Sequence, residues 1–393
     1  MVAIQKQAWS TKRLGAACLL LWIAMMGATL WPFNPHPRNR VQWLEHSEGV
    51  HFSKAGVIIS DSAFPVGDAQ WGNGRSMEIW LRADGLSNRD TILTFYAGEY
   101  PPHFLLRQYR SAVVISYELL DVGHEQPNAE IYIGDVFKGE GPTLLTVTSG
   151  IKGIKVFVDG EIRKTVPDGH LSARDFSGKL ILGTPPWSYD PWKGRLYGLA
   201  VYASELEEAR VREHYAEWTS GEIARATSDS AVARFLFNEH AGSVIHNQIP
   251  GAPDLTIPVY FHLPEKAMLA APFKEVMPLW VRINDMANNI VGFVPFGMLV
   301  YLYLVRGQSD RKAALLTILI GGTTSLLIEC LQASIPQRDS DVTDIISNTL
   351  GTIVGVMLLQ PTPIKVMLEN LGIFRSWSES RAAENETHST SGT

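Results

Sequence analysis

Cysteine is scarce in this chain of 393 residues. The two cysteines, Cys18 and Cys330, each lie in an apolar run and are far apart in sequence. No disulfide framework can therefore stabilise a domain between them, and no Cys/His spacing typical of a metal site occurs. Any folded domain in the middle of the chain must depend on its own hydrophobic core.

Long runs of one charge are also missing. The formal net charge is −6, and no extended basic segment favours binding to nucleic acid. The length allows two or three domains. Hydrophobic residues make up 46% of the chain, but long apolar runs occur only towards its two ends. This distribution predicts a soluble, β-rich domain between membrane segments.

The first apolar run, Leu14–Leu30, has no charged residue and follows a basic flank. Its length is close to the roughly 20 residues that a spanning helix needs. Trp31 and Pro32 follow it, where an aromatic belt residue and a helix stop are expected. A signal peptide cleaved after Ala28 is the alternative, although Met26 suits the minus-three position poorly. We predict an uncleaved anchor with a cytoplasmic N-terminus, preceded by Lys6, Lys12 and Arg13.

Short alternating segments separated by turn residues fill the middle of the chain. In Ser76–Arg82, three apolar residues, Met77, Ile79 and Leu81, point to one face of a predicted strand. Ile154–Lys164 contains an Asp-Gly pair between two such segments, a strong signal for a β-hairpin with a type I′ turn. Many short strands with regular turns predict an all-β sandwich.

Further elements extend this pattern. Leu180–Gly183 and Arg195–Tyr202 are predicted strands, and Ser204–Glu217 is a predicted short helix. Ser204 and Glu207 have the spacing of a capping box, so the helix is expected to begin at Ser204.

Four segments of this region resemble successive strands of a concanavalin A-like (LamG-type) jelly roll. They are SMEIWLRADG, LLTVTSGIKGIKVFVDGEI, WKGRLYGLAVYASELEEARVREHY and VARFLFNEHAGSVIHNQ. The resemblance implies two packed antiparallel sheets, with carbohydrate or protein ligands and sometimes calcium. Asp68, Asp159 and Asp190 are the candidate calcium ligands, although aspartates in loops are usually turn formers.

The sandwich is predicted to bind rather than to hydrolyse a glycan. Glycoside hydrolysis needs two carboxylates across the scissile bond, and no Glu-x-Asp-x-Glu run occurs in this region. The candidate ligand site is the loop TPPWSYDPW, in which aromatic rings can stack on sugars beside an acid. Packing of these rings over the end of the sandwich is the alternative. The candidate residues are Trp187, Tyr189, Asp190 and Trp192.

Three further spans are predicted in the last third of the chain: Met286–Val305, Ala313–Ser334 and Val342–Leu359. Basic residues between the first two mark a cytoplasmic turn. The fold prediction is therefore a membrane α-helical bundle of four spans plus an all-β jelly-roll sandwich. The predicted parts are 1–33 (N-terminus and first span), 41–265 (external sandwich), 266–284 (linker), 285–360 (three-span core) and 361–393 (cytoplasmic, disordered tail).

The polar residues of a predicted span lie on one face of its helix, and those of different spans lie at a similar depth in the membrane. Ser325, Glu329 and Gln332 lie on one helical face, and Asp344 and Asn348 lie on another. With this topology, eight polar residues lie at the outer end of the bundle: Asp285, Asn288, Asn289, Glu329, Gln332, Arg338, Asp344 and Asn348. An ionisable group at membrane depth costs about 2.5–3.5 kcal/mol, so the cluster is a candidate functional site. Its other members are Asp285, Asn288, Asn289 and the counter-charge Arg338.

Structural roles are the alternative for some of these residues. Asp341 and Asp344 lie where a helix N-terminus favours a cap or an acid. Asn288 and Asn289 can bond helix to helix. Glu329 has no such explanation from the sequence, because it lies about one turn inside an apolar helix.

The last third resembles the VanZ-like membrane family, which is named for an accessory in teicoplanin resistance. The likeness rests on NDMANNIVGFVPFGMLVYL and SLLIECLQASIPQRDSDVTDIISNTLGTIVG. ATLWPF looks like the end of that family's first span, which implies that the sandwich is inserted after it. The family features fall on Asp285, Asn289, Phe293, Pro295, Gly297, Ser325, Glu329, Gln332, Arg338, Asp344, Asn348 and Gly351.

These observations predict a multi-pass protein of the bacterial plasma membrane with both termini in the cytoplasm. One hypothesis is an envelope protein whose sandwich holds a glycan while its bundle engages a lipid or lipid-linked substrate. The second is an intramembrane enzyme or transporter that uses Glu329 and Asp344. The third is a structural or sensory scaffold. Whether the protein is an enzyme stays open, and calcium in the sandwich is the one cofactor considered.

Overall fold

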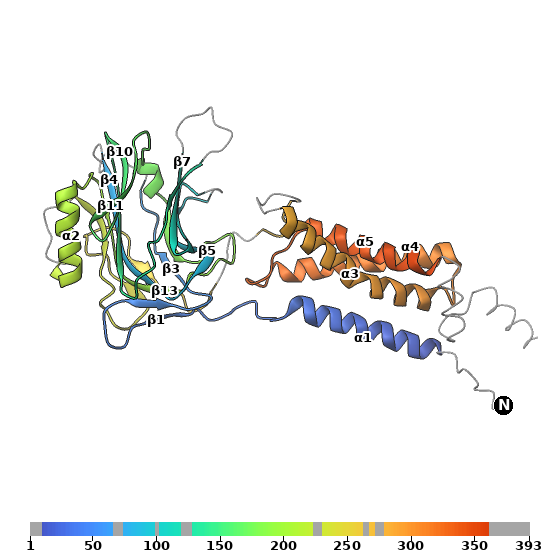
Figure 1. Ribbon diagram of the computed structural model, residues 1–393. Coiled ribbons are helices and arrows are strands. Elements are labelled where there is room, and N and C mark those ends of the chain that lie inside the picture. The colour runs from blue at the N-terminus through green and yellow to red at the C-terminus, as the bar shows by residue number, and fades with distance from the viewer. Residues whose placement is uncertain are drawn as a thin grey trace, which may run out of the picture. The chain divides into compact units, whose positions relative to one another are not determined.

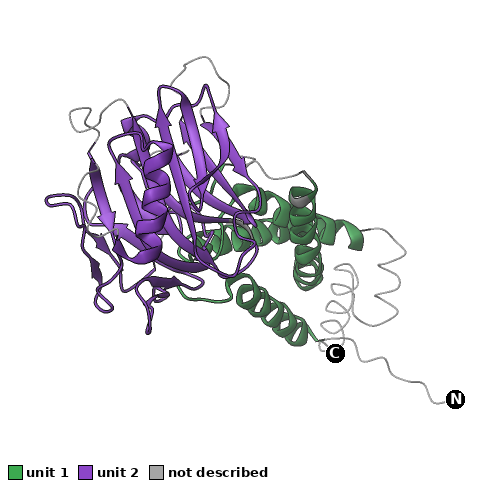
Figure 2. Cartoon of the chain, turned by 60° about the vertical axis from the view of Figure 1, so that its left-hand side comes forward, with its two compact units in different colours: residues 1–35, 266–393 green, residues 36–265 purple. Residues whose placement is uncertain are grey.

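The computed structural model describes residues 10–65, 74–98, 102–118, 128–222, 230–261, 267–271 and 279–360. The chain divides into two compact units, residues 36–265 and residues 1–35 with 266–393 (Figure 2). Three features used above lie outside the described residues: Lys6, the calcium candidate Asp68 and the tail 361–393.

Residues 36–265 form two antiparallel sheets, which confirms the predicted sandwich (Figure 1). The first sheet has the order β1-β2-β13-β4-β9-β10-β11, with β14 on β13. Its strands are β1 (Val41–Trp43), β2 (Val50–Phe52), β4 (Arg75–Ala83), β9 (Thr143–Gly150), β10 (Gly153–Val158), β11 (Glu161–Val166), β13 (Gly194–Tyr202) and β14 (Ala231–Phe235).

The second sheet has the order β15-β16-β3-β12-β5-β6-β7-β8. Its strands are β3 (Val57–Ser60), β5 (Ser87–Tyr96), β6 (Phe104–Arg110), β7 (Ala112–Glu118), β8 (Asn128–Ile133), β12 (Lys179–Gly183), β15 (Val244–Ile245) and β16 (Leu255–Thr256). Strands close in space are often distant in sequence, as with β13 between β2 and β4.

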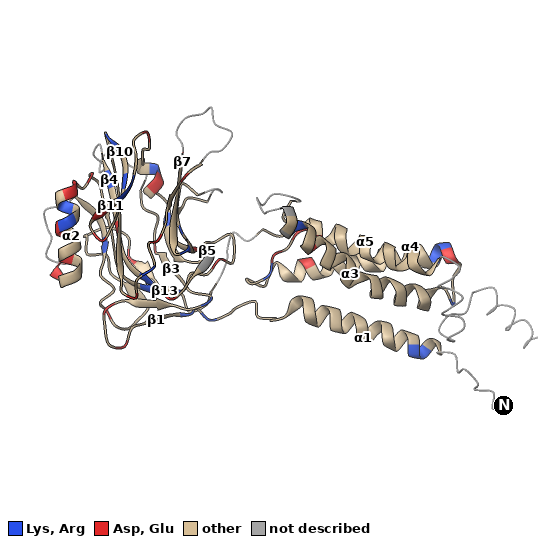
Figure 3. Ribbon diagram, in the orientation of Figure 1, with Lys and Arg blue, Asp and Glu red and all other residues tan. Residues whose placement is uncertain are grey.

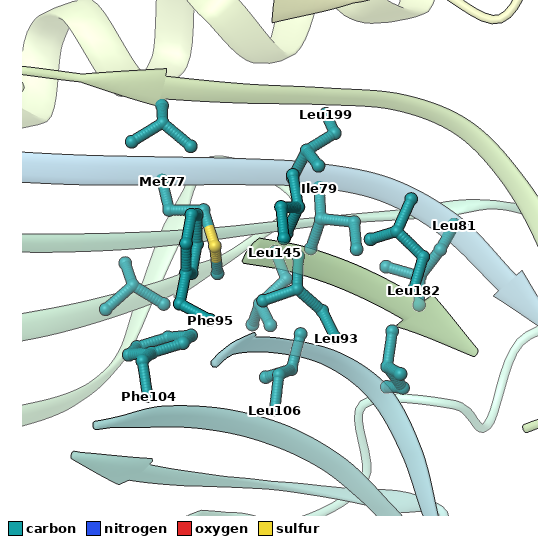
Figure 4. Packing of buried hydrophobic residues seen from close by; sticks show 14 of the residues in the cluster. Met77, Ile79, Leu81, Leu93, Phe95, Phe104, Leu106, Leu145, Leu182 and Leu199 are labelled. Atoms are coloured by element: carbon teal, nitrogen blue, oxygen red, sulfur yellow. The ribbon is translucent and has the colours of Figure 1, made fainter. Parts of the chain in front are cut away.

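The core lies between the two sheets. Met77, Ile79 and Leu81 of β4 are fully buried, as their alternation predicted. Figure 4 shows them with Leu145 and Leu199, facing Leu93, Phe95, Phe104, Leu106 and Leu182 of the other sheet. Burial of each such side chain stabilises the fold by about 1.5–3 kcal/mol, so this core holds the sandwich without a disulfide.

The predicted hairpin is confirmed. Strands β10 and β11 pair antiparallel, and the two turn residues have positive φ angles, 52° at Asp159 and 80° at Gly160. A type I′ turn needs a positive φ at both positions. The Asp159 carboxylate also accepts a hydrogen bond from the backbone N–H of Leu144 (2.9 Å). Asp159 is therefore a turn former in this structure.

The predicted capping box at Ser204 is wrong. Helix α2 spans Glu208–Ser220, and its N-cap is Glu207 without a side-chain capping bond. The Ser76 hydroxyl donates to the carbonyl of Ser204 (2.9 Å) and accepts from the N–H of Leu206 (2.9 Å). These two bonds tie the segment to the start of β4, so the helix begins four residues later.

A buried carboxylate fixes α2 to the first sheet. Glu78 of β4 is 0% exposed, although the alternation of its strand assigned it to the polar face. Its carboxylate contacts four side chains: His214 Nδ1 (3.0 Å), Trp218 Nε1 (2.9 Å), Tyr202 Oη (2.8 Å) and Thr146 Oγ1 (3.4 Å). His214 and Trp218 come from α2. A buried carboxyl group is tolerated when its oxygens are hydrogen-bonded, as they are here.

A second buried carboxylate joins a 3₁₀ turn to the end of β7. Asp175 lies in the 3₁₀ turn Ala173–Phe176. It accepts hydrogen bonds from the N–H and hydroxyl of Ser172 and from the N–H of Glu118. Burial raises the pKa of Asp175 to about 6 against the effect of these bonds. All its partners are internal, which indicates a structural role.

The other unit contains four helices that are long and apolar enough to cross a membrane, which confirms the predicted number of spans within the described residues. They are α1 (Thr11–Leu30), α3 (Leu279–Leu304), α4 (Asp310–Gln332) and α5 (Val342–Leu359). Figure 3 shows that the charged residues of these helices lie mostly near the helix ends. Helix α3 begins at Leu279, so its first turns occupy part of the predicted linker, 266–284.

Helices α3 and α5 pack closely through glycines. A Cβ atom added to Gly351 would lie 2.2 Å from the carbonyl oxygen of Ile290, and one added to Gly355 would lie 2.4 Å from that of Val294. Small residues let two helix backbones approach in this way. The spacing of Gly351 and Gly355, one helical turn apart, therefore gives α5 a smooth face against α3.

Candidate functional site

Three helices meet at the polar end of the bundle. The amide of Asn289 on α3 donates to the carboxylate of Asp344 on α5 (2.7 Å). The amide of Asn348 on α5 donates to the hydroxyl of Ser325 on α4 (2.9 Å). The two bonds join residues that are 55 and 23 positions apart in the chain. The structure thus brings these four predicted residues together in pairs.

Glu329 lies inside this end of the bundle and is 1% exposed. Its carboxylate accepts a hydrogen bond from the backbone N–H of Asp341 (3.0 Å). Asp341 is the N-cap of α5 and accepts from the N–H of Thr343 (2.7 Å), as the capping alternative predicted. Glu329 therefore fixes the loop before α5 through this hydrogen bond. It also places a carboxylate in the buried C-terminal part of α4.

Gln332 and Arg338 reach the C-terminal end of α1. The Gln332 amide donates to the carbonyl of Thr29 (3.0 Å). The Arg338 guanidinium donates to the carbonyls of Trp31 (Nε, 3.1 Å) and Ala28 (Nη2, 3.4 Å). The last carbonyls of a helix lack intrahelical donors, and a cation is favourable there. Both residues therefore connect α1 to the cluster.

A short segment before α3 also belongs to this end of the bundle. Ala270 pairs with Asp341 in a parallel bridge. The N–H of Ala270 donates to the carbonyl of Ser340 (2.8 Å), and the N–H of Val342 donates to the carbonyl of Ala270 (3.2 Å). The N–H of Leu269 donates to the Ser340 hydroxyl (3.1 Å). The sequence had no periodicity here that could have predicted this contact.

The two asparagines on α3 differ in position. Asn289 is half-buried against α5, whereas Asn288 and Asp285 lie on the exposed surface of α3. The predicted residues thus form a connected group, with Asp285 beside it. Asn289, Arg338 and Asp344 keep part of their surface accessible, whereas the other members are buried and bonded within the protein: Ser325, Glu329, Gln332 and Asn348. Within the described residues, no group of three or more His, Cys, Asp or Glu side chains is placed to hold a metal ion.

The candidate loop of the sandwich contains one residue that does not fit its predicted role. Trp192 is 1% exposed. Its indole N–H donates to the side-chain oxygen of Gln108 (2.9 Å), and its ring centroid lies 5.7 Å from that of Phe52. A ring buried in the core cannot present its face to a sugar. For Trp192 the packing alternative is therefore the one that fits the structure.

The rest of the loop lies nearer the surface. Trp187 is half-buried, with its ring 5.2 Å from that of Tyr96. Tyr189 is also half-buried, with its ring 5.8 Å from that of Phe261. Asp190 is exposed and accepts a hydrogen bond from the Ser188 hydroxyl (2.6 Å). These three residues keep accessible surface for a ligand.

We expect the two tryptophans of this loop to respond differently to substitution. Trp192→Ala removes a buried ring and should lower the free energy of unfolding by about 3–5 kcal/mol. Trp187→Ala, at a half-buried position, should lower it by about 1 kcal/mol or less. Urea unfolding of residues 36–265, followed by fluorescence, measures both. Equal effects would contradict the assignment of Trp192 to the core and Trp187 to the surface.

Comparison with protein-family models gives one match, in the second half of the chain. Residues 237–364 match the family model described as VanZ/LLP1. The chain therefore contains a VanZ-like domain that includes α3, α4 and α5, while α1 lies outside the match. The search of curated proteins found no match.

Solved structures resemble this chain only remotely. A protein from Bacteroides ovatus whose description names carbohydrate binding is 13% identical, with a TM-score of 0.38, and covers 54% of this chain. The binding domain of botulinum neurotoxin DC, solved with rat synaptotagmin II, is 15% identical, with a TM-score of 0.36, and covers 46%. The chain spans 58% and 46% of those chains. Likeness at this level has no bearing on the ligand.

Proposed function

We propose that this protein is a multi-pass envelope protein whose bundle binds the polar head of a lipid or lipid-linked substrate. The observation that supports this most is the joining of Asn289, Asp344, Asn348, Ser325 and Glu329 at one end of the bundle. Polar groups are costly at membrane depth and usually serve a site there. An effect on glycopeptide susceptibility is part of the proposal, because the domain is VanZ-like.

In this proposal the sandwich supplies a ligand-binding domain outside the cell. Trp187, Tyr189 and Asp190 combine aromatic faces with an acid, a combination suited to a glycan. The orientation rests on the basic residues Lys12–Arg13 and Arg311–Lys312, which begin α1 and α4. Basic residues favour the cytoplasmic side. Both termini are then cytoplasmic, and the polar end of the bundle faces the outer leaflet of the bacterial plasma membrane.

An intramembrane enzyme or transporter is the second candidate. The observation in its favour is the burial of the Glu329 carboxylate, 1% exposed, in an apolar helix. A transporter would need polar groups along a whole pathway. The described cluster instead lies where α4 ends and α5 begins, which favours headgroup binding.

We expect Glu329→Gln to abolish function while the protein still accumulates. Glutamine keeps a side-chain oxygen for the N–H of Asp341, so the loop should stay in place, but the charge is lost. A strain that lacks the gene would be complemented with each variant. Envelope lipids, envelope glycans and teicoplanin susceptibility would be measured. All three readouts should match those of the strain that lacks the gene.

Two carboxylates near Glu329 give the matched comparison. Asp344→Asn should behave like Glu329→Gln, because it also removes a charge from the cluster. Asp341→Asn should complement normally, because asparagine caps a helix as well as aspartate does. Full complementation by a normally expressed Glu329→Gln variant would overturn the functional assignment of the cluster.

A further inference from the structure

Helix α2 covers only part of the outer face of the first sheet. Leu144 and Tyr202 of the sheet form a buried cluster with Trp218 of α2. The Trp218 ring lies against Gly198 of β13, where an added Cβ atom would clash with it. Trp80 of β4 packs at the edge of this cluster and is half-buried. The face beyond Trp80 is therefore left to other side chains of the sheet.

A β-bulge in β13 places a second aromatic ring beside Trp80. The pairing of β13 with β4 shifts between Leu196 and Gly198, so Tyr197 is the extra residue. Its ring centroid lies 6.5 Å from that of Trp80, and both residues are half-buried. Bulges often re-aim a side chain next to a functional site. The two rings keep accessible apolar surface on which a sugar ring can stack.

A row of basic side chains lies on the same face. In the strand register, Arg195 of β13 is directly opposite both Arg82 of β4 and His51 of β2. Like charges directly opposite each other in a sheet are destabilising. Asp84 offsets part of this repulsion, because its carboxylate lies 2.6 Å from His51 Nε2 and 3.4 Å from Arg195 Nη1. Within the described residues, Arg82 has no carboxylate partner.

Three hydrogen-bond donors of this face lack acceptors. The guanidinium of Arg82, the indole N–H of Trp80 and the hydroxyl of Tyr197 form no hydrogen bond with another described residue. Burial raises the pKa of Tyr197, so its hydroxyl keeps the proton that it would donate. All three groups belong to half-buried residues. A ligand that brings acceptors would therefore gain hydrogen bonds that are partly shielded from water.

The charge of this face favours an anion. Arg82 and Arg195 share the one carboxylate of Asp84, and the exposed Lys193, whose carbonyl accepts from the N–H of Asp84 (3.1 Å), adds a third cation. Glu45, in the turn between β1 and β2, is directed to solvent with its side chain 88% exposed. A carboxylate matches the planar guanidinium group through two parallel hydrogen bonds. The ligand should therefore combine a ring with a carboxylate.

We propose that this face of the first sheet binds an acidic glycan, an oligosaccharide of uronic acids, with one sugar ring over Trp80 and Tyr197 and its carboxylate at Arg82. The inference goes beyond the proposed function, because it adds a second ligand site to the sandwich. The loop proposed above contacts the other sheet, through the ring of Trp187 on Tyr96 of β5.

The test measures the binding of trigalacturonic acid to the full chain in detergent by isothermal titration calorimetry. The matched probe is the methyl ester of the same trisaccharide, which keeps the rings but has no charge. We expect the acid to bind at least about tenfold more tightly than the ester, and to lose affinity as the salt concentration is raised. A capped triglutamate peptide carries the same charge without sugar rings and should bind at least about tenfold more weakly than the acid.

Arg82→Gln tests the carboxylate contact. It should lower the affinity for the acid about tenfold or more and leave binding of the ester unchanged. Arg163→Gln on β11 of the same sheet is the matched control, because the exposed Arg163 donates only to the carbonyl of Gly134 (3.2 Å). This variant should bind like the parent protein. Without ligand, Arg82→Gln should keep or raise the melting temperature, because it removes repulsion from Arg195, whereas a purely structural Arg82 predicts a lower one.

Equal affinity for the acid and the ester, or unchanged binding of the acid by Arg82→Gln, would overturn the inference. Triglutamate that binds as tightly as the trisaccharide would overturn it in favour of an acidic peptide. Trp187→Ala should leave binding of the acid unchanged, and loss of binding in that variant would assign the glycan to the loop instead. None of these measurements involves the bundle, so the Glu329→Gln complementation result can stand or fail independently.

Discussion

Gly351→Leu should destroy the membrane bundle. Even the Cβ atom of the new side chain would lie 2.2 Å from the carbonyl oxygen of Ile290, a backbone atom that cannot rotate away. Helices α3 and α5 would have to separate, and the pair Asn289–Asp344 would be broken with them. We expect a loss of stability of about 3 kcal/mol or more, at the upper end of overpacking effects.

The measurement is the fraction of protein that stays monodisperse after heating in detergent, followed by size-exclusion chromatography. Gly351→Ala should also be damaging, because the clash begins at Cβ. Gly27→Leu is the control, because the space around Gly27 on α1 is open. After heating, this variant should keep the same monodisperse fraction as the parent protein. A stable Gly351→Leu variant would mean that the α3–α5 contact differs from the one described.

The second large effect concerns the sandwich. Glu78→Ala should lower its free energy of unfolding by about 3 kcal/mol or more, because each buried donor that loses its acceptor costs about 1–3 kcal/mol. The change leaves His214, Tyr202 and Trp218 without their common acceptor at a site with 0% exposure. Since α2 is tied to the sheet through two of these residues, its docking should weaken first.

Urea unfolding of residues 36–265 measures this effect. Glu161→Ala is the matched control, because Glu161 on β11 is exposed and pairs with Arg212 only at 3.6 Å. An exposed pair of this kind contributes about 0–1 kcal/mol. If Glu78→Ala were as stable as Glu161→Ala, the network would contribute nothing to the fold.

Features that depend on local periodicity were predictable from the sequence. Each of the four spans is a single apolar run, and α5 has the predicted bounds, Val342–Leu359. Alternation in β4 assigned Met77, Ile79 and Leu81 to the core, and the Asp159–Gly160 pair specified its hairpin turn. The polar faces of α4 and α5 were predicted in the same way. In each case the information lies within a few consecutive residues.

The tertiary structure decided which of the polar and aromatic residues are buried, and by what. Glu78 lies on the polar face of its strand, and only the docking of α2 encloses it. Trp192 and Trp187 belong to one aromatic loop, yet only Trp192 enters the core, where Gln108 of β6 meets its N–H. The sequence pattern of β4 gives no sign that His214 will contact Glu78, and that of the loop gives no sign that Gln108 will contact Trp192.

In the membrane unit, too, the sequence could not predict which of two residues is buried, as Asn288 and Asn289 show. They are adjacent and chemically identical, and the sequence placed both at the same depth. One helical residue turns the side chain by about 100°, so α5 covers Asn289 and leaves Asn288 exposed. The sequence by itself determined the four spans, several of the sheet strands and the polar faces of α4 and α5. Contacts between segments distant in the chain decided which residues form the site, because burial and hydrogen bonding depend on the partner as much as on the residue.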